Sequence, residues 1–158
     1  MVSGNSTFGI QIGNSTGHMV TGNNIGANAA GTGALPNGTA GIYLTTSASA
    51  QFNQNLIANH DGTGDFGIYL DSSAAFAASS DNNCIVNNDA GVQNDTGTST
   101  TFANNWWGHT SGPSGAGAGS GDSVSSNVVF TPWLPVTPAC PGVLTEVFFT
   151  NGFEAVVP

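Results

Sequence analysis

The sequence contains no lysine and no arginine, so protonated histidine is the only side chain that can carry a positive charge. Its nine acidic residues give a formal net charge of −9 over 158 residues. Without Lys or Arg the chain cannot neutralise phosphate groups, which excludes binding of nucleic acid through the phosphate backbone. The same absence removes the electrostatic attraction to anionic membrane surfaces. Lysine Schiff bases, P-loops and arginine fingers are excluded as well.

Cysteine and long apolar runs are also scarce. Cys84 and Cys140 are too few for a disulfide framework and match no metal-binding motif, which leaves open whether they pair in an oxidising compartment. No apolar run is long enough to span a membrane, so membrane insertion is not expected. Residues 1–8 lack the basic and apolar parts of a secretory signal. Either the protein stays inside the cell, or the sequence is the C-terminal part of a longer exported chain, which is the interpretation we favour.

What the sequence does contain is a repeat. A block that begins Gly-Ile or Gly-Val starts at Gly9, Gly41, Gly67 and Gly91, at intervals of 32, 26 and 24 residues. A second, asparagine-bounded block follows each of them and begins at Asn24, Asn55, Asn83 and Asn105. Two short blocks in a fixed order, four times over, indicate a repeat protein.

The first block alternates apolar and polar residues, which is typical of a strand with one buried face. The flanking Gly, Asn, Ser and Thr residues favour turns over helix. Stacked coils would place each strand about 4.8 Å from its equivalent in the previous coil. The sequence therefore predicts an all-β parallel β-helix, or solenoid, of about four to five coils. Two internal stacks are predicted, one of Ile10, Ile42, Ile68 and Val92 and another of Ile12, Leu44 and Leu70.

Asparagine side chains can both donate and accept hydrogen bonds, so equivalent residues in successive coils can bond along the stack. One such ladder is predicted from Asn24, Asn55, Asn83 and Asn105. A second would contain Asn28, Asn59 and Asn87. The alternative is that these residues adopt the left-handed conformation that asparagine tolerates in turns.

Several motifs resemble the right-handed parallel β-helix repeat proteins of the pectin-lyase-like class. They are residues 24–44, the Asn-Leu-Ile-Ala-Asn block at 55–59, Ala-Asn-Asn-Trp-Trp-Gly at 103–108, Ser-Gly-Pro at 111–113, Gly-Asp at 121–122 and Phe-Thr-Pro-Trp-Leu at 130–134. The similarity covers about residues 5 to 134 and implies a right-handed parallel β-helix. The later motifs resemble the end of such a domain, which would make this chain its C-terminal portion. Because the class includes lyases, glycosidases, epimerases and adhesins, the resemblance leaves the function open.

We assign residues 1–134 to the β-helix domain and residues 135–158 to a proline-containing linker and a C-terminal strand and tail. Within the domain, the Gly/Ser/Ala-rich stretch 112–121 is predicted to be an excursion from the last coil. An open solenoid end exposes core and strand edges. Trp106, Trp107 and Trp133 are therefore predicted to cap that end, with a sugar-stacking site as the alternative.

Catalytic chemistry finds little support in the sequence. Pectate-lyase-type catalysis, which the resemblance implies, uses a basic side chain and Ca²⁺, and here the Lys or Arg base is missing. Glycosidases need converging carboxylates, and the sequence shows no close pair of acids. We expect this chain not to be an enzyme and to need no cofactor. Asp61 and Asp65, beside His60 in a Gly-rich loop, are the candidates for a Ca²⁺ site, although their spacing matches no known calcium loop.

The clearest candidate for binding is a strip of outward-facing residues. Gln11, Tyr43, Tyr69 and Gln93 alternate with the buried positions of successive coils, and Asp71 and Asp95 lie beside them. A polar and aromatic strip of this kind suits stacking on sugar rings and bonding to hydroxyls. The alternative is that the tyrosines stack on each other and only stabilise the sheet.

The sequence thus indicates a noncatalytic structural or adhesive part of a secreted or cell-surface protein, with carbohydrate or another protein chain as partner. One alternative is the C-terminal end of a carbohydrate-active enzyme whose catalytic coils lie upstream. Another is a filament or sheath subunit that self-associates through solenoid ends or edges.

Overall fold

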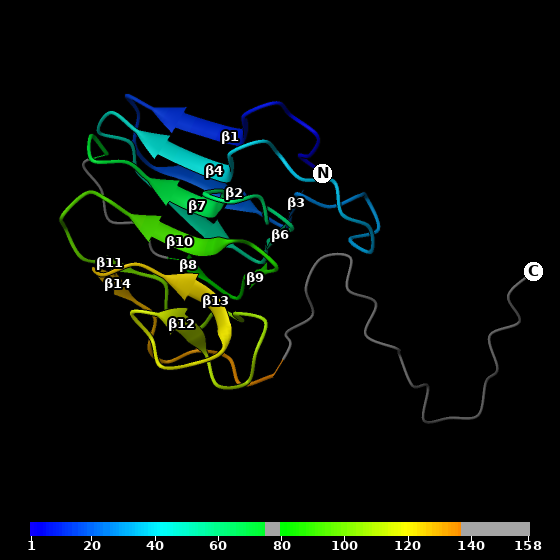
Figure 1. The fold of residues 1–158 in the computed structure, drawn as a ribbon. Helices are drawn as coiled ribbons and strands as arrows, with labels where there is room; N and C mark the ends of the chain where they lie inside the picture. The colour runs from blue at the N-terminus through cyan, green and yellow to red at the C-terminus, as the bar shows by residue number, and fades with distance from the viewer. Residues whose placement is uncertain (75–79, 137–158) are drawn as a thin grey trace, which may run out of the picture.

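The computed structural model describes residues 1–74 and 80–136, which form a solenoid of strands and turns (Figure 1). In these ranges we find no helix that is long and apolar enough to cross a membrane. One sheet runs the length of the solenoid and is called the long sheet below. Its strands, in spatial order, are β1 (Phe8–Gly13), β4 (Ala40–Thr45), β7 (Phe66–Leu70), β10 (Ala90–Asn94), β13 (Gly121–Val124) and β12 (Pro113–Gly115).

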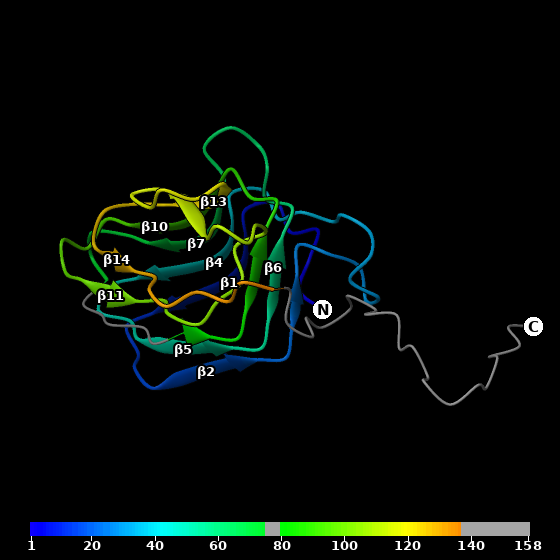
Figure 2. The same cartoon turned by 90° about the horizontal axis from the view of Figure 1, so that it is seen from below.

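Three shorter sheets form two further sides, so that the solenoid has three sides when viewed along its axis (Figure 2). The second side contains β2 (His18–Thr21), β5 (Ala50–Asn53) and β8 (Ser80–Asp81), followed by the pair β11 (Thr100–Thr101) and β14 (Val128–Val129). The third side contains β3 (Asn24–Ile25), β6 (Leu56–Ala58) and β9 (Cys84–Val86).

The coils stack in the predicted register. All strand pairs are parallel, and Ile10 lies opposite Ile42, which lies opposite Ile68. Val92 continues this stack, while Ile12, Leu44 and Leu70 form the second one. The strands β1, β4, β7 and β10 mark four successive coils, and β13 with β14 begins a fifth. The predicted all-β parallel β-helix is therefore confirmed.

The interior is narrow and filled with aliphatic and aromatic side chains. Ile42, Leu44, Ile68 and Leu70 have no exposed surface. On the opposite wall the rings of Phe52 and Phe102 stack with their centroids 6.5 Å apart. Removing such apolar surface from water is the main driving force for folding.

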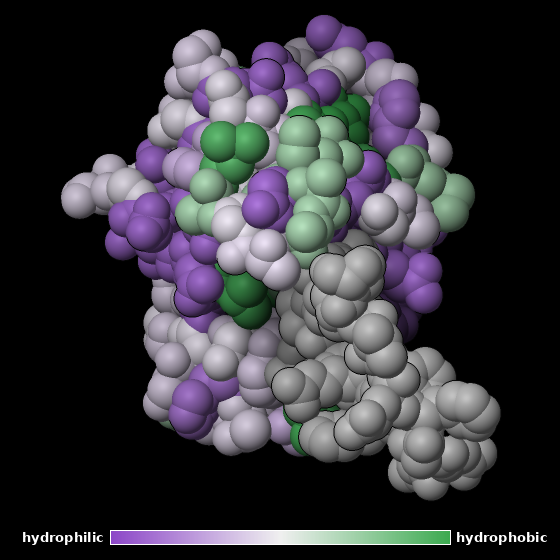
Figure 3. All heavy atoms as spheres, turned by 90° about the vertical axis from the view of Figure 1, so that its right-hand side faces the viewer, coloured by the Kyte–Doolittle hydropathy of each residue, from purple (hydrophilic) through white to green (hydrophobic). Residues whose placement is uncertain are grey.

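The third side also carries apolar residues on its outward face. Ile25, Ile57 and Ile85 point into the main core, whereas a second cluster lies behind them. This cluster consists of Ala27, Leu56, Ala58, Cys84 and Trp106, with Val86 and Leu134 packed against it. Figure 3 faces this side of the molecule and shows apolar atoms lying among polar ones.

A buried asparagine ladder runs beside the third sheet. Each member except the last, Asn105, donates from its backbone N–H and its Nδ2 to the Oδ1 of the asparagine in the next coil. These bonds are 2.8 to 3.3 Å long. The ladder contains Asn23, Asn55, Asn83 and Asn105.

The prediction that Asn24 is the first member of the ladder is wrong by one residue, since Asn23 takes this place. Asn24 lies opposite Leu56, not opposite Asn55, so its side chain leaves the ladder. Its Nδ2 instead donates to the carbonyls of Asn28 and Ala29 and closes a local loop. The sequence contains two adjacent asparagines here, and only the register of the strands distinguishes them.

The predicted second ladder is also wrong, and the turn alternative holds for two of its members. Asn59 and Asn87 have φ angles of 66° and 58°, the left-handed conformation that asparagine tolerates better than most residues. Asn59 donates to the carbonyl of Gly26, and Asn28 accepts from Thr32.

The tryptophans lie at the C-terminal end of the described solenoid. Trp107 is completely buried beneath the last coil, near Val124 and Val128 of the core cluster. Trp106 is in the outward cluster, and Trp133 is half-buried with its Nε1 donating to the carbonyl of Thr110. The predicted excursion at 112–121 contains strand β12, which pairs in parallel with β13 and extends the long sheet. A stretch without apolar alternation joins the sheet because its backbone supplies the hydrogen bonds.

The last described residues still contact the solenoid, since Leu134 N–H donates to the carbonyl of Asn105 at 3.0 Å. The predicted C-terminal strand and most of the linker, including Cys140, lie outside the described residues. The boundary at residue 134 therefore stays a prediction.

Replacing a ladder asparagine should strongly destabilise the fold. Asn83 is completely buried, and its Oδ1 accepts two hydrogen bonds while its Nδ2 donates to Asn105. Asn83→Ala leaves these partners unsatisfied, so we expect a loss of about 3 kcal/mol or more in unfolding free energy. Urea unfolding followed by tryptophan fluorescence measures this.

The matched control is Asn104→Gly, at an exposed position with φ 56°, where glycine keeps the backbone conformation. We expect a change within about 1 kcal/mol. Equal losses in the two variants would contradict a structural role for the ladder.

Candidate functional site

The predicted strip lies on the outward face of the long sheet. Gln11 is opposite Tyr43, Tyr43 is opposite Tyr69, and Tyr69 is opposite Gln93. The two tyrosines and Gln93 are half-buried, and Gln11 is exposed. The structure thus brings the four residues into one row across β1, β4, β7 and β10.

Each tyrosine hydroxyl bonds to an aspartate of the following coil. Tyr43 donates to Asp71 Oδ2, and Tyr69 donates to Asp95 Oδ2 at 3.1 Å. Gln93 Nε2 donates to the other oxygen of Asp95. The two Tyr–Asp pairs are equivalent because both aspartates follow directly on the ends of paired strands, β7 and β10.

Asp71 is held as a carboxylate. Burial pushes its pKa up, but hydrogen bonds from Ser73, Tyr43 and Thr45 outweigh this and lower the pKa to about 2. The Ser73 backbone N–H and Oγ donate to Asp71 Oδ1 at 2.8 and 2.6 Å. The carboxylate in turn raises the pKa of the Tyr43 hydroxyl, so that it remains a donor.

The aromatic rings of the strip cover each other. Phe8 and Tyr43 stack at 4.3 Å between ring centroids, and Tyr43 and Tyr69 at 5.4 Å. Phe66 stacks on Tyr69 at 4.7 Å. The alternative of mutual stacking is therefore present in the structure, and the strip offers ring edges and polar groups to solvent more than open ring faces.

The predicted metal candidates do not converge with the neighbouring histidine. Asp61 is exposed and Asp65 is half-buried, and the Asp65 N–H donates to the carbonyl of Gly62 in a tight turn. His60 instead points inward and has no exposed surface. Among residues 1–74 and 80–136 there is no group of three or more His, Cys, Asp or Glu side chains placed to hold a metal ion.

His60 belongs to a second polar stack, which the sequence analysis missed. Its members are bonded in order from one coil to the next: Asn5, Asn37, His60, Asn88 and Asp122. The stack runs along the corner that precedes the long sheet. Because its members are of three residue types, no single-residue repeat marks them in the sequence.

The recurring glycines of the long sheet are explained by this stack. A Cβ atom on Gly67 would lie 2.7 Å from the carbonyl oxygen of Gly91 and 3.0 Å from Asn88 Nδ2. At Gly41 the corresponding distances are 2.8 Å to the Gly67 oxygen and 2.8 Å to the His60 ring. Only glycine fits between the next coil and the polar stack.

The hydrogen bonds of the stack require a neutral His60. Asn37 Oδ1 accepts from Asn5, so its Nδ2 must donate to His60 Nε2 at 3.1 Å. His60 Nδ1 then carries the proton and donates to Asn88 Oδ1 at 2.9 Å. Burial lowers the pKa of His60, more than the Asn88 bond, Asp65 and Asp61 raise it.

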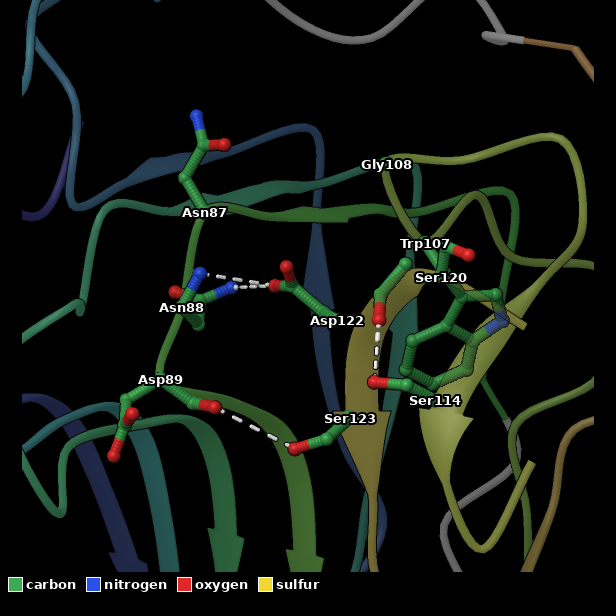
Figure 4. Close-up of a pocket in the computed structure, with 10 residues that line it drawn as sticks. Asn87, Asn88, Asp89, Trp107, Gly108, Ser114, Ser120, Asp122 and Ser123 are labelled. Carbon is green, nitrogen blue, oxygen red and sulfur yellow. Dashed lines mark hydrogen bonds between the residues drawn. The ribbon is translucent and has the colours of Figure 1, made fainter. Parts of the chain in front are cut away.

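Asp122 ends the stack beside a hollow of about 320 Å³ (Figure 4). Asn88 donates to Asp122 Oδ2 from its N–H at 3.0 Å and from its Nδ2 at 2.8 Å. Burial nevertheless raises the pKa of Asp122 to about 6. The hollow lies between the turn at 87–89 and segment 107–123 and is lined by Asn87, Asn88, Asp89, Trp107, Gly108, Ser114, Ser120, Gly121, Asp122 and Ser123.

These features define a parallel β-solenoid with an acidic, aromatic strip on its long sheet and a polar hollow at one corner. A family model described as the right-handed beta helix region matches residues 2–107. The chain belongs to this family, in agreement with the resemblance to the pectin-lyase-like class. No curated protein and no solved structure matches the chain.

The raised pKa of Asp122 makes stability depend on pH. Between about pH 4 and pH 6 the folded chain keeps a proton that the unfolded chain releases, so unfolding free energy falls as pH rises. With a folded pKa of about 6 and an ordinary value of 3.8, the loss is at most about 3 kcal/mol.

Asp122→Asn removes this ionisation but keeps an acceptor for Asn88. We expect the stability of the wild type relative to the variant to fall from about pH 4 to about pH 7, measured by urea unfolding. The lowered pKa of His60 makes its contribution to the unfolding free energy increase as pH rises. His60 is present in both proteins, so this contribution cancels in the difference between them. A difference that does not change with pH would show that Asp122 titrates normally.

Proposed function

We propose that the protein is a noncatalytic, glycan-binding part of an exported or cell-surface protein, and that the strip on the long sheet binds a neutral polysaccharide. The observation that carries the proposal is the repetition of the Tyr–Asp pair in consecutive coils, Tyr43 with Asp71 and Tyr69 with Asp95. A pair repeated at the spacing of neighbouring strands suits a ligand that is itself a repeating chain.

The aspartates supply the hydrogen-bond acceptors that sugar hydroxyls need. A carboxylate accepts stronger hydrogen bonds than a neutral oxygen does. Asp71 stays ionised because Ser73 and Tyr43 donate to it, so the acceptor is fixed in place before any ligand arrives. Gln11 lies in the same row with an exposed amide. This arrangement favours recognition by hydrogen bonds, with the tyrosine edges adding apolar contact.

The charge of the chain restricts the glycan to neutral ones. Without Lys or Arg, no group near the strip can neutralise a uronate or sulfate, and the aspartates would repel it. The low pKa of Asp71 supports a noncatalytic role, since an ionised carboxylate bonded by Ser73 and Tyr43 is a poor proton donor at neutral pH.

The strip can be tested by removing its charges. The double variant Asp71→Asn, Asp95→Asn should weaken binding of neutral polysaccharides by about tenfold or more, because two charge-assisted acceptors are lost. Glycan microarrays identify the ligand, and isothermal titration calorimetry measures its affinity. The matched control is Asp61→Asn, Asp81→Asn, which removes two exposed charges outside the strip and should leave the affinity unchanged.

Equal affinity in both double variants would eliminate the strip as the binding surface. Turnover of a polysaccharide by the wild type would overturn the noncatalytic assignment. Polymers in a sedimentation profile at low concentration would favour the filament alternative.

A further inference from the structure

We propose that the hollow beside Asp122 is a second binding site, which takes a neutral, hydroxyl-rich ligand such as a single sugar unit. The proposal goes beyond the strip and does not depend on it, because the two sites lie at opposite ends of the strands of the long sheet. Asp122 is near the start of β13, whereas Asp71 and Asp95 follow the ends of β7 and β10.

The hollow is built from two parts of the chain that meet at the corner of the solenoid. The turn at 87–89 forms one wall, and segment 107–123 forms the other (Figure 4). Its volume of about 320 Å³ is at the lower end of the range for small-molecule sites. The walls are fixed by hydrogen bonds, among them Ser114 Oγ to the carbonyl of Gly121 at 2.7 Å and Asp122 N–H to the carbonyl of Trp107 at 2.8 Å.

Asp122 is the group that would hold the ligand. Both bonds from Asn88 go to Oδ2 (Figure 4), and the backbone N–H of Asn87 also hydrogen-bonds to the carboxyl group. The polar stack therefore fixes the orientation of Asp122, which lines the hollow and whose carboxyl oxygens can accept further hydrogen bonds from a ligand. Asn87 and Ser120 are exposed at the rim and can add an amide and a hydroxyl.

The surroundings determine the chemical class of the ligand. An anion is excluded because the chain has no Lys or Arg to pair with it. An apolar ligand is disfavoured because amides, hydroxyls and a carboxyl group line the hollow. The second acid, Asp89, points away from Asp122 and accepts from the Gly64 N–H at 2.8 Å, so Asp122 acts alone (Figure 4). A ligand with several hydroxyls matches one acceptor surrounded by mixed donors and acceptors.

The test is a titration of the full chain with a panel of neutral monosaccharides and disaccharides, followed by NMR. We expect saturable binding of at least one sugar, with shifts of the Asn88 side-chain amide and of the Ser120 backbone amide. Asp122→Asn should weaken binding by about tenfold, since a charge-assisted acceptor becomes a neutral one. Asn87→Gly should weaken it by a smaller factor, and glycine accommodates the positive φ of 58° at this position.

Two controls separate this site from general effects on the fold. Asn82→Gly replaces an exposed asparagine of φ 54° at another corner, and it should bind the sugar like the wild type. The strip variant Asp71→Asn, Asp95→Asn should also bind the sugar normally. Binding at the hollow can therefore be established even if the strip binds no glycan. The proposal is overturned if no sugar binds, if Asp122→Asn binds as the wild type does, or if Ca²⁺ alone produces the same NMR shifts.

Discussion

Each coil of this protein satisfies its backbone and its buried polar groups through the coils on either side. A short strand has no partner within its own coil, so β4 pairs with β1 on one side and with β7 on the other. The side chains follow the same rule, because Asn55 bonds to Asn83 only when the two coils are in register. The stacking register is therefore the constraint on which the core, the polar stacks and both surface sites depend.

Two buried polar stacks fix that register more sharply than the apolar core does. Aliphatic side chains such as Ile42 and Ile68 tolerate small shifts, whereas a buried amide that loses its partner has a large desolvation penalty. The stacks also restrict which residues can occupy neighbouring positions. Position 41 must be glycine, because a side chain there would collide with His60. A histidine and an aspartate can replace asparagine in the second stack because each still offers the donor or acceptor that its neighbour needs.

The two candidate sites use the same stacking in different ways. On the strip, register repeats one Tyr–Asp pair in consecutive coils and produces a row of aspartate acceptors. At the hollow, the end of a polar stack presents the carboxyl group of Asp122, held in place by both bonds from Asn88. The first arrangement suits a chain-like ligand, and the second suits a single unit. In both, the lack of cationic side chains favours neutral ligands.

The sequence by itself determined the solenoid, the two aliphatic stacks and the row that contains Tyr43 and Tyr69, because these follow from strand alternation and repeat spacing. Its lack of Lys and Arg also underlies our proposal that the ligands carry no negative charge. Only the tertiary structure decided that Asn23 and not Asn24 joins the ladder, since adjacent asparagines differ only in strand register. The roles of His60 and Asp122 were likewise set by contacts between residues far apart in the sequence, which no local pattern encodes.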